Sequence, residues 1–447
     1  MFGPRVLFLQ RRNVLRVSSD SSLEGIPSSY AVEFNLVKFI RIMNVRVTGI
    51  REEHVEHIWS GDNVPHKMLL ELRAQTAIEL SFYLKVCMKV LVVSNTDLDQ
   101  IAHAYMKLDT LINIKKEVLM HYIVIKTIKN FQKKLNIKRK MCYDFLFPIC
   151  YGVTMTLRSV IANLPDQYSA IVVDNVELHG YTPHETGGSR YSGFSYNTSK
   201  KILRTMARFH AGPIAMRIKK KSKFTRKIIP ILNLEVKKYA KAPPFQTLFQ
   251  ELISCGLTDC EITRDHIVEI RDALHCYRLH DRNKNQTDQI WNTLSHSRYW
   301  NPYIMTKEGK ESILLDTSRI SYDSCCTNII SFMFTSVDPE VIEQQPQFEN
   351  LLTEYYDAFK RTLEKHQISL EEYTWNNFRT EFDTVGRRMC ANIFLNIKAS
   401  YCQIFYPQGG AIVFNDEYHR RLKAAVKMMA VYDWINISVS DSDSSSW

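Results

Sequence analysis

Polar side chains that could act on a phosphate group flank a short hairpin in the second half of the chain. Residues 291–334 predict, in order, a loop, a short strand, a hairpin turn, a second strand and a buried helix. The apolar runs of the two strands are at 304–305 and 313–315, and Glu-Gly-Lys lies in the turn between them. His296 precedes the first run, and Asp316 follows the second. Phosphoryl transfer uses such a layout, in which a loop that carries a base faces a metal-binding Asp.

A strand and a helix in the first third of the chain could complete this chemistry. Residues 78–90 alternate apolar and polar side chains, so they predict a strand with Lys85 on its polar face. Residues 107–126 carry an apolar stripe at helical spacing and include Glu117. A kinase-like amino lobe places a lysine on such a strand against phosphate oxygens. The alternative is that Lys85 and Glu117 are ordinary solvated side chains.

Two further segments are expected between these regions. Residues 169–181 (SAIVVDNVELHGY) predict a buried strand that runs into a polar turn. Residues 198–212 predict a helix, and we expect Gly212-Pro213 to stop or kink it. His210, near the end of this helix, is interpreted as a packing residue near the loop and not as a ligand.

Composition describes a large globular protein. The 447 residues, 45% hydrophobic and 23% charged, can form one bilobal unit or two domains. The ten cysteines include no CxxC pair, so we expect mostly buried thiols in a reducing compartment, the cytoplasm. No run reaches the ~20 apolar residues of a transmembrane helix. The four arginines before Asp20 suggest a mitochondrial transit peptide, although a disordered extension is the expectation we prefer.

The net charge of +11 permits an anionic partner, such as nucleotide, nucleic acid or a membrane surface. The strongest basic run is RIKKKSKFTRK, residues 217–227, and a second basic cluster lies in residues 131–140. No aromatic side chains alternate with the charges of the second cluster, as a groove for single-stranded nucleic acid would require. We expect the 217–227 run to be a solvated helix exit, and we do not expect nucleic acid or an acidic membrane as the partner.

The stretch around the hairpin also resembles the insect ecdysteroid-kinase-like family, whose members are also called choline-kinase-like or juvenile-hormone-inducible proteins. The family pattern is HGDxWxNN, an apolar strand, DFQ, and then SPxxDLxYFLxxS. Here the first part reads HSRYWNPY, residues 296–303, and the second begins at Asp316. The alignment places Arg298 where the family has its catalytic-base Asp and Tyr303 where it has a metal-binding Asn. It also places Asn328 where the family has the Asp that steadies the catalytic loop.

Other segments carry the same resemblance. Gly61 falls in the glycine turn that covers the nucleotide, and Asp174-Asn175 fall in the hinge beside the adenine, where the family has Glu-Asp. Glu117 matches the family's helix glutamate, which pairs with the strand lysine and would direct Lys85 toward phosphate oxygens. ARFHA, residues 207–211, is similar to the family's LAxFHA. Residues 349–370 and 374–378 are similar to its LLxxYYxxL and FTWExF helices.

The resemblance implies a protein-kinase-like α+β fold. It has a small lobe with an antiparallel sheet and a larger, mainly helical lobe. The expected parts are an N-terminal extension with leading helices (1–55), the amino lobe (56–170), the helical lobe (171–435) and a disordered tail (436–447). By family, ATP and Mg²⁺ are the cofactors, and the ligand is a small molecule, such as a steroid.

The substitutions decide between two functions. Arginine stays protonated, so Arg298 cannot act as a base, and the phenol of Tyr303 is a poor ligand for Mg²⁺. Asp316 is then the one metal-binding residue that the motif retains. We therefore expect a catalytically impaired pseudokinase that binds a small molecule, nucleotide or partner. The alternatives are an active ATP-dependent kinase of small alcohols such as ecdysteroids, and a basic nucleic-acid- or membrane-binding protein.

Overall fold

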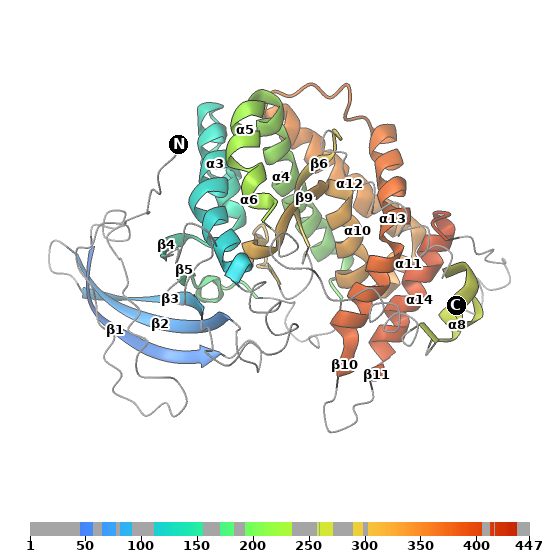
Figure 1. Cartoon of the computed structure of the whole chain (residues 1–447), viewed down its shortest axis with the longest axis horizontal. Helices are drawn as coiled ribbons and strands as arrows, with labels where there is room; N and C mark the ends of the chain where they lie inside the picture. Colours follow the sequence, from blue (N-terminus) through green and yellow to red (C-terminus); the bar gives the residue numbers. More distant parts are fainter. Residues whose placement is uncertain are drawn as a thin grey trace.

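The computed structural model describes residues 45–56, 65–76, 81–91, 111–154, 170–182, 193–234, 257–258, 260–270, 289–297, 303–404, 412–414 and 416–435. Gly61, Arg298 and the predicted tail 436–447 lie outside these residues. Within them the architecture is α+β, as predicted, with a sheet on one side and most of the helices on the other (Figure 1).

A five-stranded antiparallel sheet has the strand order β1-β2-β3-β5-β4. Its strands are β1 (Val45–Glu56), β2 (Pro65–Thr76), β3 (Ser81–Leu91), β4 (Cys150–Thr154) and β5 (Ala170–Asp174). The strand predicted at 78–90 is therefore confirmed as β3, and the strand predicted from residue 169 is confirmed as β5. β5 pairs with both β3 and β4, so strands far apart in the sequence meet in the middle of the sheet.

The sheet extends across both predicted boundaries of the amino lobe, at residues 55 and 170. Residues 45–55 were expected in leading helices, but they form most of β1, which pairs with β2 from Val45 to Glu56. Val45, Val47 and Ile50 are β-branched, and such side chains favour a strand once a neighbouring strand provides a partner. The predicted boundary at residue 170 likewise falls at the start of β5, a strand that belongs to the same sheet.

The predicted helix at 107–126 is longer than the pattern indicated. The chain is helical from residue 111, forms a π-helical turn at Met120–Ile125 and continues as α3 (Lys126–Lys134). Val124, Ile128 and Phe131 are buried at helical spacing, which explains why the helix continues past 126. The basic cluster at 131–140 thus begins as the end of a helix.

Helices, four of those described being longer than fifteen residues, form the core on the other side. They are α4 (Tyr196–Lys219), α5 (Lys221–Lys227), α6 (Ile229–Leu232), α8 (Glu261–Asp265), α10 (Cys325–Ser336), α11 (Pro339–Glu343), α12 (Gln345–Lys365), α13 (Trp375–Tyr401) and α14 (Asp416–Val431). α4 packs on α12, α10 packs on α13, and α14 packs on α11 and α13. No helix in the described part of the chain is long and apolar enough to cross a bilayer. Cys142, Cys260, Cys325, Cys326 and Cys390 are buried, in agreement with the prediction of mostly buried thiols.

Gly212-Pro213 was predicted to stop or kink the helix, and it does not stop it. α4 continues through Pro213 to Lys219, and Pro213 is buried inside it. Gly212 lacks the Cβ that would clash with the proline ring, which removes part of the restriction on the residue before a proline. Pro213 still cannot donate a hydrogen bond within the helix, and tertiary packing of the buried helix offsets that loss.

The region that was predicted as a loop before the hairpin contains a strand. β6 (Asn292–His296) pairs antiparallel with β9 (Ile320–Ser324). β6 is entirely buried although most of its residues are polar, so it shows no alternation that a sequence pattern could detect. The predicted hairpin is confirmed: β7 (Ile304–Met305) pairs with β8 (Ile313–Leu314). The buried helix predicted after the hairpin is α10.

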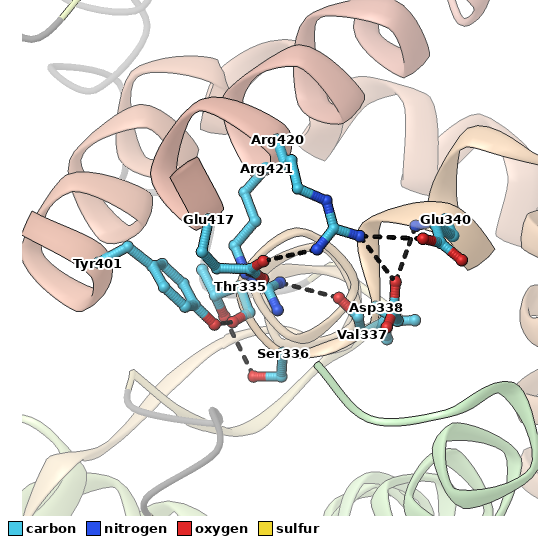
Figure 2. Close-up of polar contacts among 9 residues, drawn as sticks. All are labelled: Thr335, Ser336, Val337, Asp338, Glu340, Tyr401, Glu417, Arg420 and Arg421. Carbon is cyan, nitrogen blue, oxygen red and sulfur yellow. Dashed lines mark hydrogen bonds and ion pairs between the residues drawn. The ribbon is translucent and has the colours of Figure 1, made fainter. Parts of the chain in front are cut away.

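A polar cluster holds α14 against the end of α10 (Figure 2). The guanidinium of Arg421, 1% exposed, donates to the carbonyl of Val337 at 2.8 Å and forms an ion pair with Glu417 at 2.8 Å. It also lies 4.3 Å from the ring centre of Tyr401, whose hydroxyl donates to the carbonyl of Thr335 at 2.6 Å. Burial raises the pKa of Tyr401 to about 12, so this hydroxyl remains a donor at neutral pH.

The segment that α14 holds is also the one that receives the start of α4. Phe194 pairs with Val337 in a parallel bridge, and the Phe194 amide donates to the Ser336 carbonyl at 2.7 Å. A Cβ at Gly193 would lie 2.4 Å from the backbone of Asp338, so only glycine fits at this crossing. The C-terminal helix therefore stabilises the entry to α4 through a shared strip of backbone.

Candidate functional site

The hairpin connects two parts of the candidate site. On one side Thr182 exchanges two backbone hydrogen bonds with Thr306, of 2.8 and 2.7 Å. On the other side the Ser312 amide donates to Thr205 of α4 at 3.3 Å, and Glu311 forms an ion pair with the buried Arg208 of α4. Gly309 at the tip has φ +65°, the left-handed conformation that glycine adopts without strain. The hairpin is thus fixed between the end of β5 and the helical core.

Asp316 follows β8 with its backbone in the left-handed region, at φ 55°. Its Oδ1 accepts hydrogen bonds from the hydroxyl of Ser318 at 2.5 Å and from the Ser318 amide at 3.3 Å. Aspartate tolerates this backbone because its short carboxylate can bond the chain two residues on. The turn therefore fixes the direction of the carboxylate that the sequence predicts to be a metal ligand.

The backbone of His296 is held by a single side chain. Asn328 of α10 accepts from the His296 amide at 2.8 Å through Oδ1 and donates to the His296 carbonyl at 2.7 Å through Nδ2. Both groups of His296 are backbone groups with fixed roles, so they set the orientation of the Asn328 amide. This is the position where the family resemblance places an Asp that steadies the catalytic loop.

The same amide determines the protonation of a buried histidine. Oδ1 of Asn328 is an acceptor, so His210 Nε2, 3.0 Å away, must donate to it. The other ring nitrogen, Nδ1, then accepts from the hydroxyl of Tyr355 at 2.8 Å. Burial lowers the pKa of His210 to about 3, which agrees with this neutral tautomer. His210 is a fully buried packing residue, in agreement with its predicted role.

His296 connects this network to Asp316. Its Nε2 donates to the carbonyls of Asp316 at 2.7 Å and Leu315 at 3.0 Å, and its ring is fully buried. The ring of Tyr303 lies 6.4 Å from the ring of His296, centre to centre. His296, Tyr303 and Asp316 are therefore brought together, and the contacts of His296 position the chain rather than expose a base.

The sheet carries the remaining candidates. In the strand register, Lys85 of β3 lies opposite Glu71 of β2. The next residue of β3, Val86, lies opposite Asp174 of β5. Asp174 Oδ2 lies 2.9 Å from His179 Nε2, and the Asn175 side chain accepts from the Glu177 amide at 3.2 Å. Lys85 is thus adjacent in β3 to the residue that pairs with Asp174, where the predicted hinge begins.

The predicted pair of Lys85 and Glu117 is only partly described. Glu117 is buried, 7% exposed, in the helical residues 111–119. The side chain of Lys85 lies outside the described residues, as do Gly61 and Arg298. These assignments remain predictions.

Two contributors were missed by the sequence reasoning. Tyr355 was interpreted only as part of a packing helix, although its hydroxyl fixes His210. Ser318 was not singled out, although an Asp followed two residues later by Ser is a recognised turn pattern that could have indicated it. Among the residues that the structure describes, no three His, Cys, Asp or Glu side chains form a group that could hold a metal ion.

The segment that contains β3, the hairpin and α10 also matches a known protein family. The sequence matches the model of the Ecdysteroid kinase-like family over residues 79–368, more than half of its length, and the chain belongs to this family. None of the curated proteins with which the sequence was compared matches it.

Solved structures of phosphotransferases show weak similarity. Spectinomycin phosphotransferase APH(9)-Ia, in complex with ADP and spectinomycin, is 8% identical with a TM-score of 0.35, over 87% of this chain and 97% of that one. The ethanolamine kinase of Plasmodium vivax is 10% identical, with a TM-score of 0.33, over 87% and 84%. LicA in complex with AMP is 13% identical, with a TM-score of 0.33, over 89% and 98%. TM-scores at this level decide neither the fold nor the function of this chain.

Proposed function

We propose that this chain is a protein-kinase-like member of its family in which the phosphoryl-transfer centre is impaired, so that it binds a small molecule, nucleotide or partner without efficient catalysis. The observation that carries this proposal is the environment of Tyr303. The family resemblance requires a metal-binding amide there, and the residue is a phenol whose ring lies beside the buried ring of His296. Its backbone carbonyl accepts from the Leu315 amide at 2.8 Å, so the position is held next to Asp316.

The residues present do not fit the family's Mg²⁺ site. Magnesium binding in such sites uses an amide oxygen and a carboxylate together, both hard oxygen donors. A neutral phenol at Tyr303 is a poor substitute. One oxygen of Asp316 already accepts two hydrogen bonds from Ser318. Arg298, at the family's base position, cannot accept a proton from an alcohol. We therefore derive no transfer step through a bound metal.

Binding of a nucleotide does not require the metal site or the catalytic base, and several residues support it. ATP in a kinase-like cleft would meet Lys85 of β3, paired with Glu117, and the hinge that begins at Asp174-Asn175, with Gly61 covering the phosphates. In such a cleft the sheet and the helices form two lobes. Nucleotide recognition by a hinge depends mainly on backbone groups, so the change from Glu-Asp to Asp-Asn is compatible with it. The ten cysteines of the sequence include no CxxC pair, which supports a reducing location such as the cytoplasm.

The second candidate is an active kinase of small alcohols, such as an ecdysteroid. The observation that favours it is the intact frame: Asn328, His210 and His296 form a continuous network that ends at the backbone of Asp316. This network fixes the backbone of His296 and Asp316 on the two sides of the candidate site, and an active kinase would need that positioning.

The test is binding of ATP by the purified protein, measured as a thermal shift with and without Mg²⁺. The proposal expects any stabilisation by ATP to be independent of Mg²⁺, and no phosphorylation of ecdysone or other small alcohols above a blank. In the double variant Arg298→Asp, Tyr303→Asn the ATP shift should become Mg²⁺-dependent. Turnover by the unmodified protein that is abolished by Asp316→Asn, but not by the exposed control Asp357→Asn, would establish the active kinase instead.

A further inference from the structure

A basic depression of about 500 Å³ lies where α4 turns into α5. Every residue that lines it except one serine is a cation. The lining residues are Lys219, Lys220, Lys221, Ser222, Lys223, Arg226 and Lys227. α4 ends at Lys219 and α5 begins at Lys221, and Lys220 between them has φ −140° and ψ 47°, a break that brings the two helix ends into one concave surface.

The corner that carries this basic depression is fixed from beneath. Phe224 of α5 is buried, and its ring centre lies 6.0 Å from that of Tyr322. Arg217, one turn before the corner, donates to the backbone carbonyls of Gln289 at 2.8 Å and Ile290 at 2.5 Å. The basic residues therefore project from a rigid framework rather than from a free loop.

No acidic residue neutralises this surface along the chain, because the sequence contains no Asp or Glu between Glu185 and Glu235. Within the described ranges, none of the lining cations forms an ion pair with a carboxylate. Lys219 donates instead to the neutral side chain of Gln367, at 3.2 Å. Like charges that share one small depression repel one another. An anion bound among them would relieve this repulsion and be stabilised.

The end of α3 adds a further charge to the same surface. Burial lowers the pKa of Lys223, and the charges of Lys227, Lys134 and Lys220 lower it further. Lys134 is the last residue of α3, so segments almost ninety positions apart in the sequence contribute to one field. The run at 217–227, expected to be a solvated helix exit, is thus part of a surface that the sequence alone could not assemble.

We propose that the basic depression is a binding site for a compact anion that carries several phosphate groups, either free or as the headgroup of a lipid. Its small volume and clustered cations match neighbouring phosphates rather than an extended backbone. No aromatic ring lines it, whereas single-stranded nucleic acid is held by stacked aromatics. Ile218, 47% exposed, lies directly beside the lysines and would contact the acyl region if the headgroup belonged to a membrane.

The experiment measures binding of inositol hexakisphosphate by calorimetry at physiological ionic strength. The variant Lys221→Gln, Arg226→Gln, Lys227→Gln removes three cations of the site. A matched control removes three exposed cations elsewhere: Arg264→Gln, Lys310→Gln, Arg361→Gln. The site variant should bind at least roughly tenfold more weakly than the unmodified protein, and the control within about twofold, because close charge pairs act locally while distant charges are screened.

Two further arms identify the source of the phosphates. Flotation with phosphatidylcholine vesicles that contain phosphatidylinositol bisphosphate tests the lipid form, with phosphatidylserine vesicles of equal charge as the comparison. Duplex DNA tests the competing partner. Lack of binding to both phosphate probes, equal loss in site and control variants, or binding to DNA with the same mutational profile would each overturn the proposal. If circular dichroism shows that the triple variant is unfolded, Lys221→Gln alone should still weaken binding measurably. None of these results depends on the nucleotide cleft.

Discussion

Replacing Asn328 by Asp should destabilise the protein strongly at neutral pH and much less in mild acid. The substitution changes one buried NH₂ group to an oxygen and leaves the shape of the side chain unchanged. The lost group is the donor to the His296 carbonyl, at 2.7 Å. An oxygen in its place faces another oxygen at that distance, in a position that is fully buried. Ionised Asp therefore fits this network poorly, whereas protonated Asp can donate as Asn does.

The magnitude follows from these contacts. The lost neutral hydrogen bond contributes about 1 kcal/mol, and leaving a buried charge without compensation costs about 3–5 kcal/mol. Protonation of the new carboxyl group avoids the cost of the buried charge. The pKa of this carboxyl group should therefore be higher in the folded variant than in the unfolded one. A carboxyl group whose pKa is raised in the folded state loses stability as pH rises from its unfolded pKa, about 4, to its folded pKa. The penalty should thus be about 3–5 kcal/mol at pH about 7.5 and less than half of that near pH about 5.

Urea unfolding followed by circular dichroism at both pH values measures this difference against the unmodified protein. Asn376→Asp is the matched control, because Asn376 is exposed near the start of α13, and it should change the unfolding free energy by less than about 0.5 kcal/mol. The reasoning is refuted if Asn328→Asp costs the same at both pH values, or costs no more than the control.

Other perturbations test the remaining contacts. Burial lowers the pKa of His210 from 6.5 to about 3, so as pH falls the unfolded state takes up the proton first. The free energy of unfolding should therefore fall by roughly 5 kcal/mol between pH about 6.5 and pH about 3. In acid titration followed by circular dichroism, His210→Gln should not show this loss. A Cβ at Gly386 would lie 2.2 Å from the ring of Trp434, so Gly386→Ala should lower the unfolding free energy by about 1–3 kcal/mol in urea. Arg421→Met removes the buried cation that bonds Val337 and pairs with Glu417, which keeps Arg420 as a partner at 3.1 Å, so the loss should be about 1–3 kcal/mol by the same assay.

The elements that the sequence predicted well are those whose pattern reflects their own burial. β3 and β5 alternate or run apolar, and the hairpin is bounded by a glycine turn, so each could be located within a few residues. α4 continues past the predicted stop because Gly212 has no Cβ to clash with Pro213, and because packing of the buried helix offsets the hydrogen bond that Pro213 cannot donate. The local rule gives the cost of a proline in a helix but not the packing that offsets it.

The candidate site was harder to predict because its geometry depends on partners distant in the sequence. β6 is polar and buried, and it becomes a strand only through pairing with β9. The role of Asn328 could be inferred from the family resemblance, but its two bonds to His296 and its effect on the tautomer of His210 require the packed helices α4 and α10. A basic surface built from α3, α4 and α5 is likewise a property of packing and not of any run of residues.

The clamp that α14 places on the Val337 backbone has a consequence for synthesis of the protein. The stretch that defines the family ends at residue 368, yet Arg421 and Trp434 complete the core that α4 and α10 begin. A ribosome releases the chain from its amino end, and domains fold as units once their last element has emerged. The helices around the site must therefore wait, with apolar faces uncovered, until residue 435 has left the exit tunnel. Apolar surface exposed in this way makes a folding intermediate prone to aggregate, so slower synthesis of the last segment should lower the yield of folded protein.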